Sequence, residues 1–287
     1  MTCVVSKLYI VATPIGNLKD ISIRALEILA AVDLVAAEDT RHTRRLLDHF
    51  EIKQKLIAFH DHNERRQTDL LIDRILAGES VALVSDAGTP LISDPGFRLV
   101  RAARAAGLVV EAVPGASAVT AALSVSGLPT DHFQFLGFLP AKGRATKLAD
   151  VSRYPGTLIL YEAPHRIASL LGTILEVLGG DRELVICREL TKLYEQVTQG
   201  LVGEIRDKVT RGEIPARGEF VVLISGATVE PSIAQIELDD CLRLLIAELP
   251  ISKAAELAGQ MLGLKRNLVY KRALELKEAA TDVVIIG

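Results

Sequence analysis

The stretch VALVSDAGTPLISDPG, residues 81–96, decides the fold. Its first four residues are apolar, as in a buried strand, and small turn-forming residues follow at once. In open parallel sheets, ligands bind outside the carboxyl ends of the strands. Small residues there let backbone amides approach a ligand closely. We therefore expect residues 85–96 to form a binding loop, with Ser93 or Asp94 capping the helix that follows.

The N-terminal half around this stretch alternates between strand and helix patterns. Strands are expected at Leu8–Ala12, Leu34–Ala37, Leu56–Phe59, Val81–Val84 and Val109–Val113. Helices are expected at Ile23–Ala31, Thr68–Ala77 and Phe97–Ala106. This alternation predicts an α/β fold with a parallel sheet and crossover helices.

The pattern of predicted strands and helices changes after Gly127, where a second α/β region is expected. Its strands are predicted at Phe133–Phe138, Thr157–Tyr161, Leu184–Cys187 and Phe220–Ile224, with helices near Arg144–Val151 and Ile167–Leu178. The stretch Ala227–Pro231 has the composition of a linker. The predicted domains are therefore residues 1–127, 128–226 and 227–287.

The last segment differs in charge from the residues before it. Between Ile251 and Glu278, six Lys and Arg residues stand against three Glu, whereas residues 227–250 hold five acids and one Arg. Ser252 is expected to cap a helix that ends near Leu262, with Gly263 at a turn and a second helix from Lys265. The pattern predicts a small helix-turn-helix-like module with one basic face.

Composition limits the classes of protein that fit. The formal net charge of −3 gives no overall basic field, so any nucleic-acid surface has to be a local patch. The three cysteines share no metal-ligand spacing and favour a reducing compartment. No run of 18 apolar residues is present, and we expect a cytoplasmic protein.

Two further loops follow predicted strands. Residues 14–18, Pro-Ile-Gly-Asn-Leu, lie where a nucleotide-binding loop would lie, although they lack the spaced glycines of the dinucleotide fingerprint. Residues 114–118, Pro-Gly-Ala-Ser-Ala, open a helix whose free amides suit a polar or anionic group. For each loop, ordinary turn formation or tight packing explains the residues about as well.

Taken together, these loops resemble those of the tetrapyrrole-methylase superfamily. The resemblance rests on Thr-Pro-Ile-Gly-Asn-Leu at 13–18, Ala-Glu-Asp-Thr-Arg-His-Thr at 37–43, Ser-Asp-Ala-Gly-Thr-Pro at 85–90, Pro-Gly-Ala-Ser at 114–117 and Tyr-Glu-Ala-Pro-His-Arg at 161–166. It extends over nearly the whole chain. It is closest to a branch that 2′-O-methylates a cytidine in the decoding region of small-subunit (16S) ribosomal RNA.

The resemblance implies the class III fold of two α/β domains, a homodimer, and S-adenosylmethionine as the cofactor in the cleft between the domains. Its partner would be small-subunit ribosomal RNA, within the assembled subunit. By position in the motifs, the residues that would bind the cofactor are Pro14, Asp86, Ala87, Gly88, Thr89, Pro90, Ser117, Ala118, Tyr161 and Glu162.

The resemblance does not identify a proton acceptor. A ribose hydroxyl is a poor nucleophile, so a nearby base or close orientation helps methyl transfer to it. Glu162, His165 and Lys192 are the candidates for a catalytic role. For each of them, a structural role in a salt bridge or a cap is the favoured interpretation. Positioning of the reactants alone would be sufficient for methyl transfer.

Two groups of cations are candidates for RNA binding. Arg41, Arg44 and Arg45 follow Asp39 and Thr40, either of which is expected to cap a helix. The C-terminal group, in which a cation and an aromatic ring share a helix side, suits phosphate contact and base stacking. Its members are Lys265, Arg266, Tyr270, Lys271 and Arg272. A solvated face explains the first group equally well, and a packed basic helix explains the second.

Three alternatives remain open at this level. One is a methyltransferase that acts on a tetrapyrrole. Another is a metal-dependent hydrolase built on His60 and His62, although no further ligand spacing supports a metal and we expect none. The third is a non-catalytic nucleic-acid-binding protein, which leaves the small-residue loops unexplained.

Overall fold

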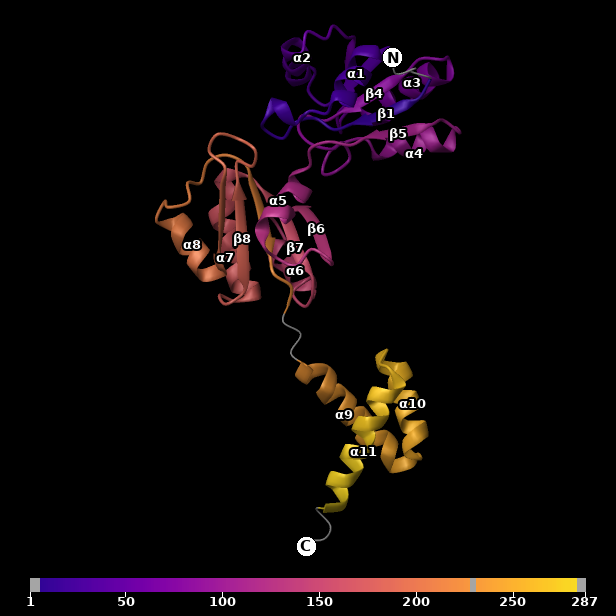
Figure 1. Ribbon diagram of the computed structural model, residues 1–287, viewed down its shortest axis with the longest axis vertical. Helices are drawn as coiled ribbons and strands as arrows, with labels where there is room; N and C mark the ends of the chain where they lie inside the picture. Colours follow the sequence, from indigo (N-terminus) through magenta and orange to yellow (C-terminus); the bar gives the residue numbers. More distant parts are fainter. Residues whose placement is uncertain (1–5, 228–230, 283–287) are drawn as a thin grey trace. The chain divides into compact units, whose positions relative to one another are not determined.

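The computed structural model describes residues 6–227 and 231–282 of the 287-residue chain (Figure 1). Its contacts divide the chain into two compact units, Met1–Ala227 and Thr228–Gly287. Within the described ranges, no helix is long and apolar enough to cross a membrane. Each unit is described by itself below.

The first unit begins with a five-stranded parallel sheet in the order β3-β2-β4-β1-β5. Its strands are β1 (Leu8–Val11), β2 (Leu34–Ala37), β3 (Leu56–Ala58), β4 (Val81–Val84) and β5 (Val110–Val113). Its helices are α1 (Ile23–Ala31), α2 (Thr40–His49), α3 (Glu64–Leu76) and α4 (Phe97–Ala105). The parallel sheet predicted from the sequence is confirmed, with each expected strand within one residue of its predicted ends.

Side chains alternate between the two faces of this sheet, and helices bury both faces. Tyr9 and Val11 pack with Ile28 and Leu47 on the face that α1 and α2 cover. Leu8, Leu34 and Leu83 point the other way, toward residues of α3 and α4. Burial on both faces explains the nearly continuous apolar runs of the strands.

The second sheet has the order β6-β7-β10-β8-β9 and mixes directions. Strand β6 (Phe133–Phe138) runs parallel to β7 (Thr157–Glu162). The pairings of β7 with β10 (Phe220–Ile224), of β10 with β8 (Glu183–Arg188) and of β8 with β9 (Gln196–Leu201) are antiparallel.

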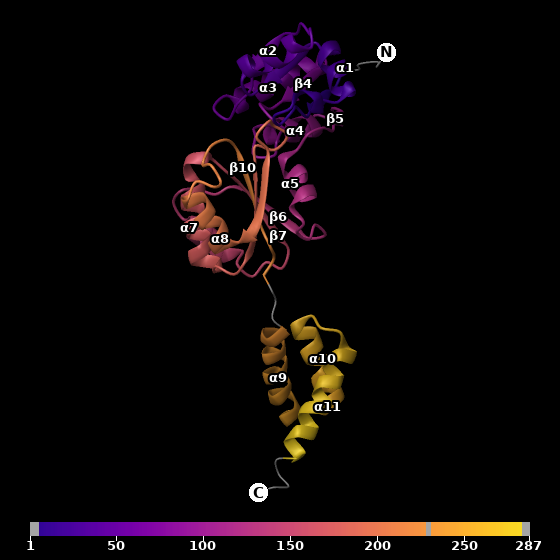
Figure 2. The ribbon, with the colours of Figure 1, turned by 60° about the vertical axis from the view of Figure 1, so that its left-hand side comes forward.

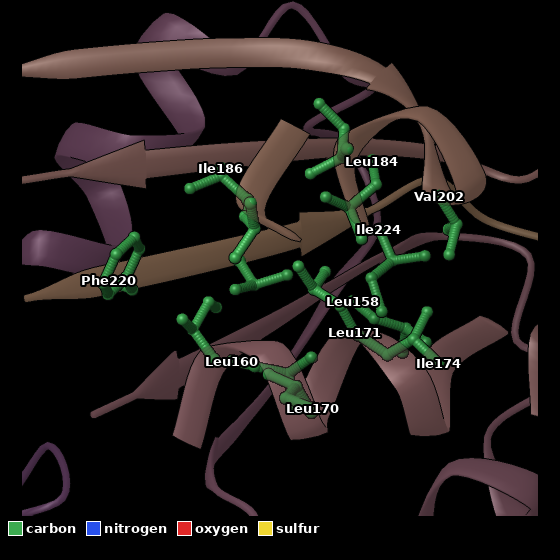
Figure 3. Packing of buried hydrophobic residues seen from close by; sticks show 14 of the residues in the cluster. Leu158, Leu160, Leu170, Leu171, Ile174, Leu184, Ile186, Val202, Phe220 and Ile224 are labelled. Atoms are coloured by element: carbon green, nitrogen blue, oxygen red, sulfur yellow. The ribbon is translucent and has the colours of Figure 1, made fainter. Parts of the chain in front are cut away.

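Helices cover both faces of the second sheet as well. Leu158, Leu184 and Ile224 pack against α7 (Ile167–Leu178) and α8 (Val202–Thr210), as Figure 3 shows for the core on that side. A shorter helix, α6 (Arg144–Asp150), contributes Leu148 to the same core. The opposite face packs against α5 (Ala118–Ser126).

Some elements differ from the sequence-based expectation. The structure adds β9, which has few apolar residues, and α8, whose buried residues Val202, Ile205 and Val209 follow a helical spacing that was not recognised from the sequence. Helix α5 packs on the second sheet, although its residues fall within the first predicted domain, residues 1–127. The division of the first unit at residue 127 stays a prediction.

The second unit is a three-helix bundle of α9 (Pro231–Glu248), α10 (Ile251–Leu262) and α11 (Arg266–Asp282) (Figure 2). Leu238 and Leu242 of α9 pack with Ala255, Ala258, Val269 and Ala273 of the other two helices. Gly263 ends α10 with φ +67°, the left-handed conformation that glycine adopts at no steric cost. The turn between α10 and α11 lies where it was predicted, but Pro250, not Ser252, occupies the N-cap position of α10.

Candidate functional site

Hydrogen bonds join the loops that follow β1 and β4, two neighbouring strands of the parallel sheet. The backbones of Thr13 and Gly88 exchange both of their hydrogen bonds, at 2.8 and 3.0 Å. The Thr13 hydroxyl donates to the carbonyl of Ser85 (3.1 Å), and the Thr89 hydroxyl donates to that of Ala116 (3.2 Å). Gly88 has φ +81°, and a Cβ there would lie 3.3 Å from Ile15. The short residues of the SDAGTP run therefore let three loops meet closely.

These loops form one wall of a cavity of about 370 Å³, hereafter the first cavity. Small residues from the first sheet's loops lie on this wall: Ala87, Gly88, Ser117 and Ala118. The second sheet and its loops supply larger apolar groups: Phe138, Tyr161, Leu190, Phe220 and Val221. A cavity of this size with a mainly apolar lining and a few polar groups has the character of a small-molecule site.

Three carboxyl groups, those of Glu38, Asp86 and Asp94, line the first cavity together. Burial raises the pKa of Glu38, and the nearby charge of Asp86 adds to the rise. Burial and then the charge of Glu38 raise the pKa of Asp94 to about 6. Burial, with the charge of Asp94, raises the pKa of Tyr161 to about 12. Burial and mutual repulsion therefore destabilise the charged forms of these carboxyl groups. A positively charged ligand group beside them would relieve this, so the wall favours such a group.

The backbone fixes the Asp86 carboxylate between two loops. Its Oδ1 accepts a hydrogen bond from the backbone N–H of Asp39 (3.0 Å), and the backbone N–H of Asp86 donates to Glu38 Oε2 (3.3 Å). Asp39 in turn caps α2 through Arg41 N, as the sequence predicted. Neither Ser93 nor Asp94 caps α4. That expectation was wrong, because Glu64 of α3 accepts from the N–H groups of Gly96 and Arg98 instead.

A second cavity of about 290 Å³ adjoins the first, and Ile15, Asp86, Ala87 and Glu219 line both. Its other lining residues are Pro14, Gly16, Leu18, His42, Arg45, Leu46 and Lys192. Helix α2 therefore presents three side chains, His42, Arg45 and Leu46, to this cavity. The two cavities share a wall, so a ligand in one is adjacent to a ligand in the other.

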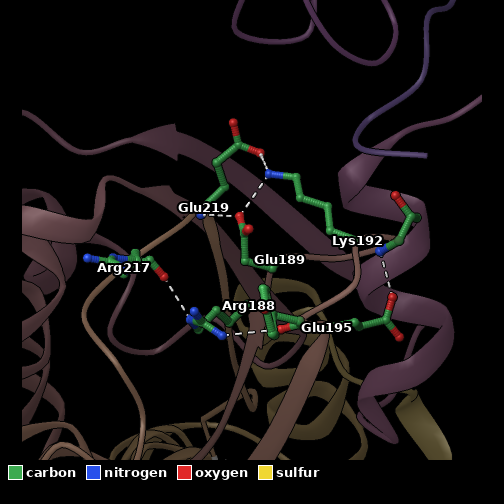
Figure 4. Close-up of polar contacts among 8 residues, drawn as sticks. Arg188, Glu189, Lys192, Glu195, Arg217 and Glu219 are labelled. Atoms are coloured by element: carbon green, nitrogen blue, oxygen red, sulfur yellow. Dashed lines mark hydrogen bonds and ion pairs between the residues drawn. The ribbon is translucent and has the colours of Figure 1, made fainter. Parts of the chain in front are cut away.

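Lys192 lies at the rim of the second cavity and is held by two carboxylates (Figure 4). Its Nζ is 2.8 Å from Glu189 Oε1 and 2.8 Å from Glu219 Oε2. Partial burial lowers the pKa of the Lys192 ammonium, but its hydrogen bonds to Glu189 and Glu219 outweigh burial and raise it. A lysine whose charged form is stabilised in this way cannot readily accept a proton, so the contacts do not support the catalytic role considered for Lys192.

Glu162 lines the first cavity but is only 2% exposed. Its Oε1 accepts from the N–H of Ala163 (2.9 Å) and lies 3.1 Å from Nε of Arg166, while Oε2 accepts from Arg144 (3.3 Å). With both oxygens engaged, Glu162 anchors the turn that follows β7. These contacts favour an anchoring role over the proton-accepting role considered for it.

The remaining predicted residues divide between the cavities. Of the cofactor set, Asp86, Ala87, Gly88, Thr89, Ser117, Ala118, Tyr161 and Glu162 line the first cavity, and Pro14 lines the second. Pro90 lines neither of the two cavities. His165 is exposed on the short 3₁₀ turn Pro164–Arg166 and also lines neither.

The predicted RNA-binding cations have different surroundings. Arg45 faces the second cavity, Arg44 is half-buried, and Arg41 is paired with Asp39 at 2.7 Å. Lys265, directly before α11, is exposed, as are Arg266, Tyr270 and Lys271 on the helix. Arg272 instead holds Asp239 of α9 by two hydrogen bonds of 2.8 and 2.6 Å. These bonds join two helices, and the RNA-binding role expected for Arg272 stays a prediction.

The His60 and His62 rings lie edge to face with centroids 5.9 Å apart. His60 Nε2 is 3.3 Å from Asn63 Nδ2, in the turn before α3. In the described part of the chain, no group of three or more His, Cys, Asp or Glu side chains is arranged to hold a metal ion. The pair therefore gives no support to a hydrolase site.

Several lining residues were missed from the sequence, among them Glu38, Asp94, Phe138, Leu190 and Glu219. Glu38 lies in the recognised motif at 37–43 but was given no role there, and Asp94 had been considered as a helix cap. Glu219 directly precedes β10, and its position beside the first sheet's loops depends on how the two sheets meet. A single sequence holds no local signal for such a contact.

Family models match this chain in both units. The model described as Tetrapyrrole (Corrin/Porphyrin) Methylases matches residues 7–206, and the one described as RsmI C-terminal HTH domain matches residues 233–277. With the sheets and the first cavity, these matches place the chain in the tetrapyrrole methylase family. The class III fold expected from the sequence, with its C-terminal helix-turn-helix-like module, is confirmed.

Curated relatives narrow the family further. Ribosomal RNA small subunit methyltransferase I of Pseudomonas aeruginosa is 52% identical over 93% of this chain and 96% of its own. The protein of that name from Vibrio cholerae is 50% identical over 93% of this chain and 94% of its own. Within the tetrapyrrole methylases, the chain belongs to the family of ribosomal RNA small subunit methyltransferase I.

Solved structures share the fold at low sequence identity. Uroporphyrin-III-C-methyltransferase from Thermus thermophilus superposes with a TM-score of 0.55 at 22% identity, over 77% of this chain and 94% of its own. Diphthine synthase superposes with a TM-score of 0.61 at 16% identity, over 78% of this chain and 91% of its own.

The crowded carboxyl groups make a first prediction about stability. The folded pKa of Asp94, about 6, lies above its ordinary value of 3.8, so folding takes up a proton between these pH values. The stability contributed by the neutral form is present below pH 4 and is lost as the pH rises through 6. Asp94→Asn mimics the neutral form, so it should raise the free energy of unfolding above pH 6 and leave it nearly unchanged near pH 4.

Urea denaturation at pH 4 and pH 7.5 measures both values. Asp69→Asn, an exposed position on α3, is the matched control and should have little effect at either pH. An equal shift for Asp94→Asn at the two pH values would show that Asp94 does not titrate in this range.

Proposed function

We propose that this chain transfers a methyl group from S-adenosylmethionine to the 2′-oxygen of a cytidine in the decoding region of small-subunit ribosomal RNA. The observation that carries the proposal is the match over nearly the whole chain to relatives named for small-subunit ribosomal RNA methylation. The two cavities supply a place for a cationic cofactor beside a place for a second ligand.

The residues of the first cavity fit S-adenosylmethionine. The cofactor carries positive charge on its sulfonium and amino groups, and Glu38, Asp86 and Asp94 provide carboxylates that burial leaves in need of a counter-charge. The apolar wall of Phe138, Leu190 and Val221 suits an adenine ring. A uroporphyrin-III methyltransferase of the same fold, 19% identical, is described as complexed with S-adenosylhomocysteine.

When bound, the cofactor supplies a methyl group on a positively charged sulfur, which an oxygen nucleophile displaces. The chain's own residues bind and orient the reactants. Asp86 is fixed at the wall that the two cavities share, and Glu162 holds the turn of Ala163 and Pro164 against the first cavity. Orientation of this kind accounts for much of enzymatic rate enhancement.

The proposal extends to the assembly and the place of action. A ribosomal RNA substrate places the enzyme in the cytoplasm, with the assembled small subunit as its target. A homodimer is proposed from the family resemblance. The strongly exposed apolar side chains Leu193 (88%) and Tyr194 (70%), just before the edge strand β9, are surface that a second copy would cover.

A tetrapyrrole substrate has less support than RNA. A porphyrinoid substrate has no need of a basic helical module, whereas the second unit exposes the cations Arg266 and Lys271 on α11. Uroporphyrinogen is the appropriate negative substrate in any assay of the chain.

The direct test is transfer of tritiated methyl from S-adenosylmethionine to small ribosomal subunits that lack their native modification. We expect label on a ribose 2′-oxygen of a decoding-region cytidine after digestion and mapping, and none on uroporphyrinogen. Label on uroporphyrinogen alone would assign the chain to tetrapyrrole methylation. Absence of label on both substrates would contradict the proposal.

The exposed cations of α11 generate a prediction about RNA affinity. Arg266→Ala with Lys271→Ala removes two charges available to phosphates, so the subunit concentration for half-maximal rate should rise. The slope of log affinity against log salt should become shallower by about one to two, as each lost phosphate contact releases fewer counterions.

Arg272→Ala is the informative comparison, because this side chain pairs with Asp239 and Glu275. It should lower the melting temperature of the second unit and leave the salt slope nearly unchanged. If the double variant kept both the affinity and the slope of the unaltered protein, α11 would have no part in RNA binding.

A further inference from the structure

The second cavity shares a wall with the cavity that fits the cofactor. Ile15, Asp86, Ala87 and Glu219 belong to both linings. For methyl transfer, the acceptor atom has to come within about 3–3.5 Å of the methyl carbon. An acceptor bound in a cavity that adjoins the cofactor cavity meets this requirement without rearrangement of the sheets.

We propose that the second cavity receives the acceptor nucleotide, flipped out of the RNA, and that Glu219 contacts it while Lys192 positions Glu219. The inference rests on the proposed function and deepens it, since it assigns the acceptor subsite. Enzymes that modify one nucleotide of a structured nucleic acid commonly take it out of its stack into a fitted pocket.

The lining of the second cavity suits an uncharged nucleoside. Two cations, Arg45 and Lys192, are balanced by two carboxylates, Asp86 and Glu219. The apolar groups of Pro14, Leu18 and Leu46 offer surface to a planar base. Carboxylates accept hydrogen bonds from the exocyclic amine of cytosine and from ribose hydroxyls, and cations donate to its carbonyl oxygen. The mixture of donors and acceptors therefore matches a cytidine better than a bare phosphate.

Glu219 is placed for direct contact. Its side chain is 75% exposed, and its Oε2 lies 2.8 Å from Lys192 Nζ. Its backbone is fixed as well, because the Glu219 N–H donates to Glu189 Oε1 (2.9 Å) and the Glu189 N–H donates to the Glu219 carbonyl (3.0 Å). An exposed carboxylate on a fixed backbone beside both cavities is available to accept a hydrogen bond from a ligand.

Lys192 is built into the loop with some backbone strain. Glu189 and Thr191 have φ of +52° and +67°, values that non-glycine residues seldom adopt. The Lys192 stem also packs so closely over Gly16 that a Cβ at residue 16 would collide with it. The loop thus adopts unfavourable backbone conformations that hold the Lys192 ammonium between Glu189 and Glu219, as expected for a positioning residue.

The test uses the full chain and small subunits that lack the modification. The variants are Glu219→Gln, Lys192→Met and the double variant, with Glu213→Gln and Lys147→Met as controls. Glu213 likewise forms a surface ion pair, with Arg211 at 2.7 Å, and neither control residue lines the two cavities. Three quantities are measured: subunit binding without cofactor, KM and kcat for subunits, and the Kd of S-adenosylmethionine by calorimetry.

We expect each single variant to weaken subunit binding and raise KM about tenfold, the effect of losing a hydrogen bond to a charged group. The cofactor Kd should stay within about twofold for Lys192→Met, because Lys192 lines the second cavity and not the first. The double variant should lose less than the product of the two single losses, because Lys192 acts through Glu219. The controls should match the unaltered protein in all three quantities.

Three failures are distinguishable. Should the unaltered protein methylate subunits while Glu219→Gln and Lys192→Met leave binding and KM unchanged, the assignment of the acceptor subsite is overturned and the proposed function stands. Multiplicative losses in the double variant would overturn the positioning role of Lys192. If the unaltered protein transfers no methyl to subunits, the proposed function fails and the subsite assignment fails with it.

Discussion

The crowding of Glu38, Asp86 and Asp94 at one edge of the parallel sheet is the constraint on which the site depends. Three carboxyl groups share a partly buried wall, and burial together with mutual repulsion raises the pKa values of Glu38 and Asp94. Hydrogen bonds between the loops, such as those joining Asp86 to Asp39 and Glu38, keep the groups from moving apart. A cationic ligand relieves this repulsion, so the same arrangement that costs stability to the protein alone favours binding.

Charge is handled differently on the second sheet's side of the site. Glu162 is buried between Arg144 and Arg166, and Glu189 and Glu219 share Lys192. Glu162 and Glu189 are held by cations of the protein and fix turns and loops, and Glu219 shares Lys192 while its side chain stays exposed. The acids of the first sheet have no such cation beside them in the described part of the chain and favour a positively charged ligand. The site is therefore divided into one side that binds through unpaired charge and one that supplies shape and orientation.

Much of this architecture was readable from the sequence because both parallel-sheet faces are buried, which leaves uninterrupted apolar runs such as Val81–Val84. The loop residues Asp86 to Thr89 were predicted because turn formation and capping do not explain a long run of short residues directly after a buried strand. The cap of α4 was predicted wrongly, since Glu64 comes from another helix. The bond of Arg272 to Asp239 was not foreseen, because the two residues are 33 positions apart. Glu219 and the second cavity arise from contacts between loops of the two sheets, which no local pattern records.

The most direct measurement of the central claim, that the acidic wall binds the charged end of the cofactor, compares two ligands as the pH changes. Calorimetry would give the Kd of S-adenosylmethionine and of the uncharged-sulfur product S-adenosylhomocysteine between pH 5 and pH 8, for the unaltered protein and Asp94→Asn. The account predicts that affinity for S-adenosylmethionine falls as the pH drops through about 6, where Asp94 becomes neutral, more steeply than for the product. In Asp94→Asn this difference in pH dependence should disappear. Identical pH dependence for both ligands in both proteins would contradict it.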